Sequence, residues 1–212
     1  MIKKNLKPIV LSGIVLLLPV LAGVILWKRL PAEIAVHFNS HGQADNWCSK
    51  PTAVFLLPLA LAVMHFFCIL MTALDPKNKN IEGKPFGIVL WICPLVSVLT
   101  SGVMYAYSLD MRFEIGTIFM LFFGLMFIAI GNYMPKCRQN YTLGIRLPWT
   151  LSDEYNWNAT HRLAGKVWVA GGAAIILLSF TGAFWFFAAI LAVMVIIPAV
   201  YSYAYYKKHK TS

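Results

Sequence analysis

Long charge-free apolar stretches constrain this chain more than any other feature of its sequence. Four of them cover residues 8–27, 53–74, 86–107 and 115–134, and a fifth, residues 167–206, is long enough for two helices. Apolar runs of about 18 or more residues are typical of transmembrane helices. We therefore predict six spans, with five as the alternative.

The fifth apolar stretch must contain a turn between two helices, and the first of these helices must start before the stretch begins. Thr181 and Gly182 lie near the middle of the fifth stretch and are the predicted turn. The half before this turn is short for a bilayer, so we expect the fifth span to start at Leu163. A helix start is also predicted just before it, with Ser152 as the N-cap and acidic residues in the first turn.

Composition excludes a soluble globular protein. Hydrophobic residues make up 59% of the chain and charged residues only 12%, against roughly 25% in soluble domains. All the charged side chains lie outside the apolar stretches, as expected from the cost of placing a charge in lipid. The net charge of +10 follows from this segregation, and we predict no direct contact with nucleic acid.

Basic residues predict the orientation of the chain. Fourteen of the eighteen Lys and Arg residues fall in the N-terminus, the second and fourth loops and the C-terminal tail. Because Lys and Arg accumulate in cytoplasmic loops, both termini are predicted to lie in the cytoplasm. The fold class is thus an all-α bundle of six transmembrane helices in a bacterial plasma membrane, with lipids as its surroundings.

Two polar loops interrupt the apolar pattern, and both are expected to be ordered. One, residues 28–52, is predicted to be external, and the other, residues 135–166, cytoplasmic. We predict two domains, residues 1–74 with the external loop and residues 75–212 with the cytoplasmic loop.

The external loop carries His37, His41 and Asp45 at four-residue spacing. On a helix this spacing would place three metal-ligating side chains on one face. Gly42 and the neighbouring Asn and Ser residues disfavour a continuous helix, so no metal site is predicted and these three residues remain a weak alternative. Trp47 is expected at the outer membrane interface.

The cytoplasmic loop combines basic, aromatic and hydrogen-bonding residues. One stripe of a helix is predicted to carry Trp157, His161, Ala164 and Trp168, with Asn158 and Arg162 beside it. Arg146 and Arg162 either hold an anion or mark the cytoplasmic side. No zinc-protease motif, phosphate loop or nucleophile elbow is present, so we predict no catalytic residue and no cofactor.

The predicted span interiors offer one ionisable side chain other than Cys or Tyr, His65. A neutral imidazole bonded to a neighbouring carbonyl is the expected state. A transport pathway would normally contain more ionisable groups. A small transporter or lipid-handling protein therefore remains an alternative, as does a metal-dependent membrane enzyme that uses the external loop.

Two motifs resemble those of a known family, the SdpI family of bacterial multipass membrane proteins. The cytoplasmic loop matches its characteristic segment at Gly144, Ile145, Arg146, Pro148, Trp149, Thr150, Leu151, Trp157, His161 and Arg162. The external loop is similar to a domain found at the N-terminus of such proteins, at Leu30, Pro31, His37, Phe38, Asn39, Gly42, Asp45, Lys50 and Pro51. Leu147 departs from the pattern, where Thr or Ser is common.

This resemblance implies an immunity function. The expected partner is a secreted antimicrobial peptide toxin, which the protein would bind rather than degrade, and a cytoplasmic transcriptional repressor is a second expected partner. The residues expected to bind the toxin or the other partner are His37, Asp45, Trp47, Arg146, Pro148, Trp149, Thr150, Trp157, His161 and Arg162.

Overall fold

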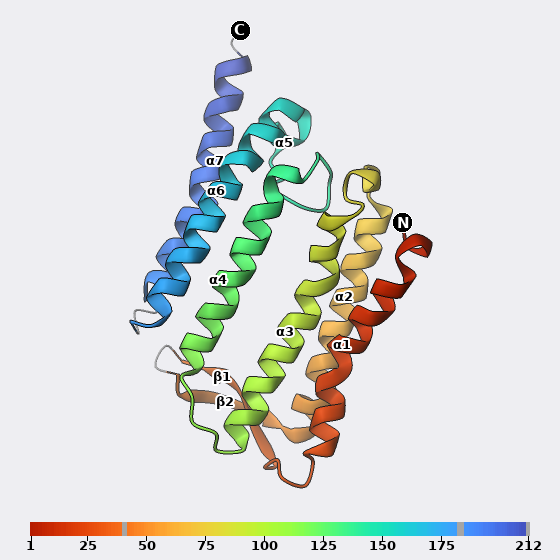
Figure 1. The fold of residues 1–212 in the computed structure, drawn as a ribbon, viewed down its shortest axis with the longest axis vertical. Coiled ribbons are helices and arrows are strands. Elements are labelled where there is room, and N and C mark those ends of the chain that lie inside the picture. Colours follow the sequence, from red (N-terminus) through yellow and green to blue (C-terminus); the bar gives the residue numbers. More distant parts are fainter. Residues whose placement is uncertain (40–41, 182–184, 211–212) are drawn as a thin grey trace. The chain divides into compact units, whose positions relative to one another are not determined.

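A computed structural model describes residues 1–39, 42–181 and 185–210 of the chain (Figure 1). Six helices within these residues are long and apolar enough to cross a membrane, which confirms the predicted number of spans. They are α1 (Leu6–Ile25), α2 (Leu57–Leu74), α3 (Lys84–Ser108), α4 (Ile115–Tyr133), α6 (Glu154–Ser179) and α7 (Trp185–Lys210). The protein is therefore a multipass membrane protein.

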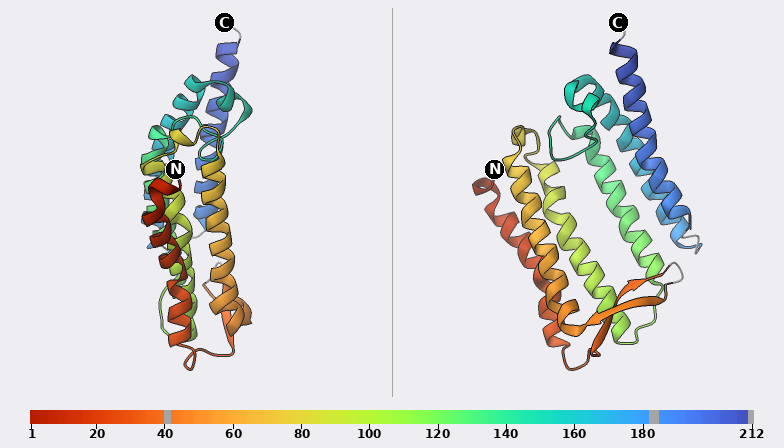
Figure 2. Two further views of the ribbon diagram at one scale, coloured as in Figure 1. Left: turned by 90° about the vertical axis from the view of Figure 1, so that its right-hand side faces the viewer. Right: turned by 180° about the vertical axis from the view of Figure 1, so that it is seen from behind.

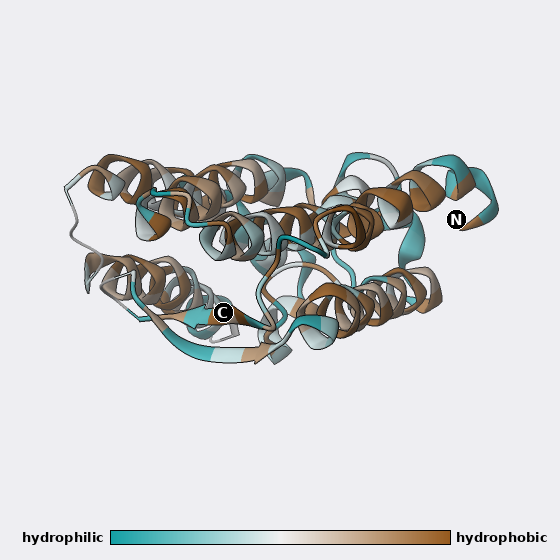
Figure 3. Cartoon of the chain, turned by 90° about the horizontal axis from the view of Figure 1, so that it is seen from below, coloured by the Kyte–Doolittle hydropathy of each residue, from teal (hydrophilic) through white to brown (hydrophobic). Residues whose placement is uncertain are grey.

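The outer faces of these helices are apolar. Leu11, Ile14 and Leu21 of α1 each expose half or more of their surface, and the helices carry hydrophobic residues along most of their length (Figure 3). Water would not tolerate this much exposed apolar area on a folded chain. Lipid tails are the solvent that fits these faces.

Short helical elements extend or connect the spans. They are η1 (Lys3–Asn5), η2 (Thr52–Leu56), η3 (Asn78–Asn80), η4 (Met134–Lys136) and α5 (Pro148–Ser152). The element η2 is a π-helical turn in which the N–H of Leu57 donates to the carbonyl of Thr52. Pro58 follows directly, and the wider turn accommodates a residue that has no N–H and a bulky ring.

A β-hairpin lies between α1 and α2, where the sequence predicts an ordered loop without strands. Its strands β1 (Glu33–Phe38) and β2 (Ala44–Ser49) pair antiparallel, with irregularities in register on both sides of His37. Ile34 is fully buried in an apolar cluster that includes Met104 of α3, and the half-buried Val36 packs against the same cluster, so these two residues anchor β1. This anchoring supplies the packing that an isolated hairpin lacks.

The chain divides into two compact units. The first contains residues 1–73 and 86–115, with α1, α2, α3 and the hairpin; the second contains residues 74–85 and 116–212. Within the first unit α1, α2 and α3 lie side by side (Figure 2). The hydroxyls of Ser97 and Tyr105 on α3 donate to the carbonyls of Leu16 and Pro19 on α1, at 2.9 and 3.2 Å.

His65 is fully buried in the first unit. Its Nε2 lies 3.0 Å from the hydroxyl of Ser12, which itself donates to the carbonyl of Ile9. Because the hydroxyl proton is used on Ile9, the imidazole N–H donates to the Ser12 oxygen. The expected carbonyl partner is thus replaced by a hydroxyl on the neighbouring helix.

Close contact between α4 and α6 shapes the second unit. A Cβ atom at Gly131 would lie 2.9 Å from the carbonyl oxygen of Gly165, and one at Gly124 would lie 2.8 Å from that of Gly172. The two glycines on each helix are seven residues apart, so the same face of each helix makes both contacts. Small residues let membrane helices approach to this distance.

The helix α6 begins at the predicted helix start and continues without a break into the span predicted from Leu163. It starts at Glu154, and its N-cap is Asp153, whose carboxylate accepts the N–H of Tyr155 at 2.8 Å. The prediction of Ser152 as the cap is wrong, because that hydroxyl donates to the carbonyl of Trp149. The break to α7 falls near the predicted turn, with Thr181 after the end of α6 and Gly182 outside the described residues.

Candidate recognition surfaces

Residues 137–162, here called the platform, form an ordered connection from η4 through α5 into α6. Trp157 is completely buried, and its indole N–H donates to the carbonyl of Cys137 at 2.7 Å. The His161 ring stacks on it, with 4.0 Å between ring centroids. These two residues are the centre around which the loop folds.

The hydrogen bonds of His161 define its tautomer. Its Nδ1 lies 2.8 Å from the carbonyl of Trp157, which can only accept, and its Nε2 lies 3.0 Å from the N–H of Ile145, which can only donate. The proton therefore sits on Nδ1, and the ring is neutral. The histidine holds the turn at Ile145 instead of presenting a free nitrogen.

Gly144 is required for this turn. Its φ angle is +105°, and a Cβ atom there would collide with Nε2 of His161 and lie 3.1 Å from the Trp157 ring. Only glycine adopts this conformation without strain and leaves room for the imidazole.

Thr150 closes the next turn and is also fully buried. Its hydroxyl donates to the carbonyl of Ile145 at 2.7 Å and accepts the N–H of Leu147 at 2.9 Å. The amide of Gln139 donates to the carbonyls of Thr150 and Leu151 at 3.0 Å each. A side chain at either end of the loop thus satisfies backbone groups that would otherwise be buried without partners.

Trp149 attaches α5 to α7. Its indole N–H donates to the hydroxyl of Ser202 at 2.9 Å, and its ring contacts those of Tyr203 and Tyr206. Asn156 of α6 donates to the carbonyl of the same Ser202 at 3.0 Å. The platform is therefore joined to two spans of the second unit.

The exposed side chains of the platform are different residues. Arg146, Pro148 and Arg162 are exposed, and Nη1 of Arg146 donates to the carbonyl of Tyr141 at 2.6 Å. The predicted site residues of this loop thus separate into exposed groups and the buried or half-buried Trp149, Thr150, Trp157 and His161.

The sequence did not predict three buried polar residues that lie in the platform or contact it. Asp75, Gln139 and Asn140 all have less than a tenth of their surface exposed. The side-chain carbonyl of Asn140 accepts the N–H groups of Thr142 and Leu143 at 2.9 and 2.7 Å. Asn residues often stabilise turns in this way, so a turn at this position could have been predicted from the sequence. A single sequence carries no comparable signal for the burial of Asp75.

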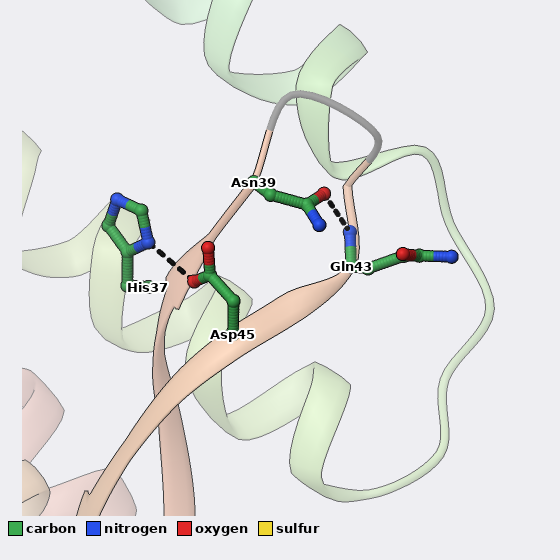
Figure 4. A network of polar contacts seen from close by, with 4 residues as sticks. All are labelled: His37, Asn39, Gln43 and Asp45. Carbon is green, nitrogen blue, oxygen red and sulfur yellow. Dashed lines mark hydrogen bonds and ion pairs between the residues drawn. The ribbon is translucent and has the colours of Figure 1, made fainter.

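The hairpin presents a second polar group (Figure 4). Nδ1 of His37 lies 2.5 Å from the carboxylate of Asp45 on the opposite strand, and both side chains are largely exposed. Beside them, the Asn39 side chain accepts the N–H of Gln43 at 3.1 Å. Trp47 exposes 51% of its surface.

Among the described residues, no three His, Cys, Asp or Glu side chains lie close enough together to bind a metal ion. The external-loop metal site considered as an alternative therefore has no ligand set within these residues. His41 lies outside the described residues. His37 and Asp45 meet across a strand pair and not along a helix face.

Two cysteines lie near these surfaces. Burial raises the pKa of the Cys137 thiol, an effect partly offset by its hydrogen bond with Asn140. Burial also raises the pKa of Cys48 in β2. Both thiols are therefore poor nucleophiles near neutral pH.

Comparison with known proteins identifies two family regions. The SdpI/YfhL protein family matches residues 136–202, and a domain of unknown function, DUF1648, matches residues 14–62. The immunity protein SdpI of Bacillus subtilis strain 168 is 33% identical over 97% of both chains. No solved structure matches this chain.

Proposed function

Because the chain belongs to the SdpI/YfhL protein family, we propose that it is a membrane immunity protein that protects a bacterial cell against a secreted antimicrobial peptide toxin. The observation that carries this proposal is the similarity to an immunity protein over 97% of both chains. Protection acts by binding, with no bond made or broken in the toxin.

The proposed orientation places both termini and the platform in the cytoplasm. Fourteen basic residues lie on the N-terminus, the second and fourth loops and the tail, against four on the other loops. This distribution favours the basic side as cytoplasmic. The hairpin then faces outward, where a secreted toxin arrives.

The hairpin is the proposed contact for the toxin. Trp47 offers a large exposed aromatic surface, and the neighbouring His37 and Asp45 offer a fixed polar pair. Aromatic side chains with adjacent hydrogen-bonding groups are the usual anchors of peptide recognition. An amphipathic toxin can use both kinds of contact.

The platform is the proposed contact for a cytoplasmic repressor. Arg146, Pro148 and Arg162 form its exposed part, and Trp149, Thr150, Trp157 and His161 hold that part in place. An arginine-bearing surface suits carboxylate groups on a partner protein. Membrane capture of the repressor would follow from this contact.

A protection assay tests the proposed function. Sensitive cells that express the chain should survive a secreted peptide toxin of the type to which SdpI confers immunity. Trp47→Ala and Asp45→Asn should reduce survival at equal amounts of membrane protein, whereas Gln43→Ala, on the same hairpin, should not. Absence of protection by the unmodified chain would refute the proposal.

The cytoplasmic contact has a separate test. Arg146→Ala should abolish co-purification of a repressor while leaving the protein in the membrane. If no cytoplasmic protein co-purifies with the unmodified chain in toxin-treated cells, the signalling part of the proposal fails and protection is judged alone.

The alternatives also have distinct outcomes. Stoichiometric zinc that is lost in the His37→Ala variant would favour a metal-dependent membrane enzyme. Efflux of an amphiphile by the purified, reconstituted protein would favour a transporter or lipid-handling protein.

The proposed boundary between the two domains, at residues 74 and 75, lies between the two matched family regions.

A further inference from the structure

Asp75 is a buried carboxylate directly after the last residue of α2. It exposes 4% of its surface. One carboxylate oxygen accepts the N–H of Lys77 at 2.7 Å, within its own turn. A buried charge is tolerated only when hydrogen bonds replace the lost water. The other hydrogen bonds of Asp75 therefore indicate its role.

Those remaining contacts are to the platform. The second oxygen of Asp75 accepts the backbone N–H of Tyr141 at 2.8 Å and the hydroxyl of Thr142 at 2.6 Å. They join segments 66 and 67 residues apart in the sequence. A local turn would need the bond to Lys77 alone, so these two bonds are a separate feature.

Asp75 is connected to Arg146 through one residue. The carbonyl of Tyr141 accepts the guanidinium of Arg146 at 2.6 Å, while the N–H of Tyr141 donates to Asp75. Fixing Tyr141 therefore fixes the acceptor that orients the exposed arginine.

Neighbouring residues of the same loop reinforce this contact. The ammonium group of Lys77 donates to the side chain of Gln139 and lies 5.6 Å from the centre of the Tyr141 ring. Asn80 donates to the carbonyl of Gln139 at 2.7 Å. The loop after α2 thus contacts the beginning of the platform at several points.

We propose that Asp75 is a positioning residue that orders Tyr141 and thereby presents Arg146 to the partner of the platform. This inference rests on the proposed function for the identity of the partner. The matched family regions end at residue 62 and begin again at residue 136, so Asp75 belongs to neither. The recognition surface accordingly includes the loop between α2 and α3.

Limited trypsin digestion of the purified full-length protein in detergent tests the positioning. Cleavage after Arg146 should be about tenfold faster in Asp75→Asn, because a charge-assisted buried hydrogen bond is lost and the new amide faces a backbone donor. Cleavage after Arg112, in another loop, is the internal control and should not change. Asp153→Asn is the matched control, since Asn also caps a helix.

Thr142→Val provides a second variant that removes one bond and keeps the carboxylate. It should accelerate cleavage less than Asp75→Asn, and the two effects should be non-additive in the double variant because they share one contact. If Asp75→Asn does not accumulate, the Thr142→Val result decides. Unchanged cleavage in both variants, or additive effects, would overturn the positioning role.

Repressor capture and survival separate this inference from the proposed function. At equal membrane amounts, Asp75→Asn should reduce repressor co-purification, though less than Arg146→Ala because the arginine itself is retained, and Asp75→Glu should reduce it less again. Faster cleavage with unchanged co-purification would contradict the link to function. If the unmodified chain neither protects nor captures a partner, the proposed function fails while the digestion result still judges the positioning.

Discussion

At the residue scale, Gly144 shows how one position can control the platform. Replacement by Ala should cost about 1–2 kcal/mol for the left-handed backbone, and more for the collision with His161. Thermal unfolding in detergent measures the loss of stability. Gly83→Ala is the control, because Gly83 has a φ of +86° but open space around its Cβ position. Equal losses would contradict a role for the collision.

Cys137 and Cys48 offer a test of burial by alkylation. Burial raises the pKa of both thiols, so the reactive thiolate is scarce at pH 8 and increases as the pH rises toward the raised pKa. Cys137 is also buried while Cys48 is partly exposed, so alkylation of Cys137 should be slower by about tenfold or more. Mass spectrometry of digested protein measures both rates. In denaturant the rates should converge, and equal native rates would contradict the structure.

The raised pKa of Cys137 also has a consequence for stability. The unfolded chain loses the thiol proton at a lower pH than the folded chain does. The contribution of this group to stability is therefore fully present below the ordinary thiol pKa and is lost as the pH rises from there through the raised pKa of the folded chain.

Residue roles were partly visible in the sequence. The stripe of Trp157, His161, Ala164 and Trp168 was predicted because helical spacing places them on one face; the first three are buried, and Trp168 is partly buried. The cap was misplaced by one residue because Ser152 and Asp153 are both good caps and only packing chooses between them. Asp75 was missed because burial of a loop carboxylate depends on contacts with residues far along the chain.

At the element scale, the contact between α4 and α6 depends on the absence of side chains. In Gly131→Ala the new methyl group would lie 2.9 Å from backbone atoms of Gly165 and Val169, which cannot move as a side-chain end can. Overpacking of this kind costs about 1–3 kcal/mol. Gly102→Ala, on α3 with open space, is the control and should be neutral or slightly stabilising. Thermal unfolding in detergent compares the two, and equal stability would contradict the close approach.

Helices and strands differed in how well the sequence predicted them. The spans were predicted because each must be apolar over the thickness of a bilayer, which leaves a long and specific pattern. The hairpin was missed because its strands are short and β2 has no alternation, with Asp45, Asn46 and Trp47 all exposed. Its stability comes from the packing of Ile34 and Val36 against an apolar cluster, which is a tertiary contact.

At the scale of the whole molecule, the proposed immunity function requires the hairpin and the platform to face opposite sides of the membrane. A toxin from outside can reach only the first surface, and a cytoplasmic repressor can reach only the second. If each of the six candidate spans crosses the membrane once, the two surfaces come to lie on opposite sides, because the hairpin follows the first span and the platform follows the fourth. The direction of insertion is the remaining element of the proposal.

Labelling of intact cells with a membrane-impermeant maleimide measures that direction. Gln43→Cys on the hairpin and Tyr155→Cys on the platform introduce thiols at exposed positions, in a chain where Cys48 is replaced by Ser. Cys137 is a poor reporter for the platform because it is buried. The hairpin thiol should label in intact cells, and the platform thiol only after permeabilisation. The reverse pattern would place Arg146 outside the cell, where it cannot meet a repressor, and the proposed division between toxin contact and cytoplasmic contact would fail.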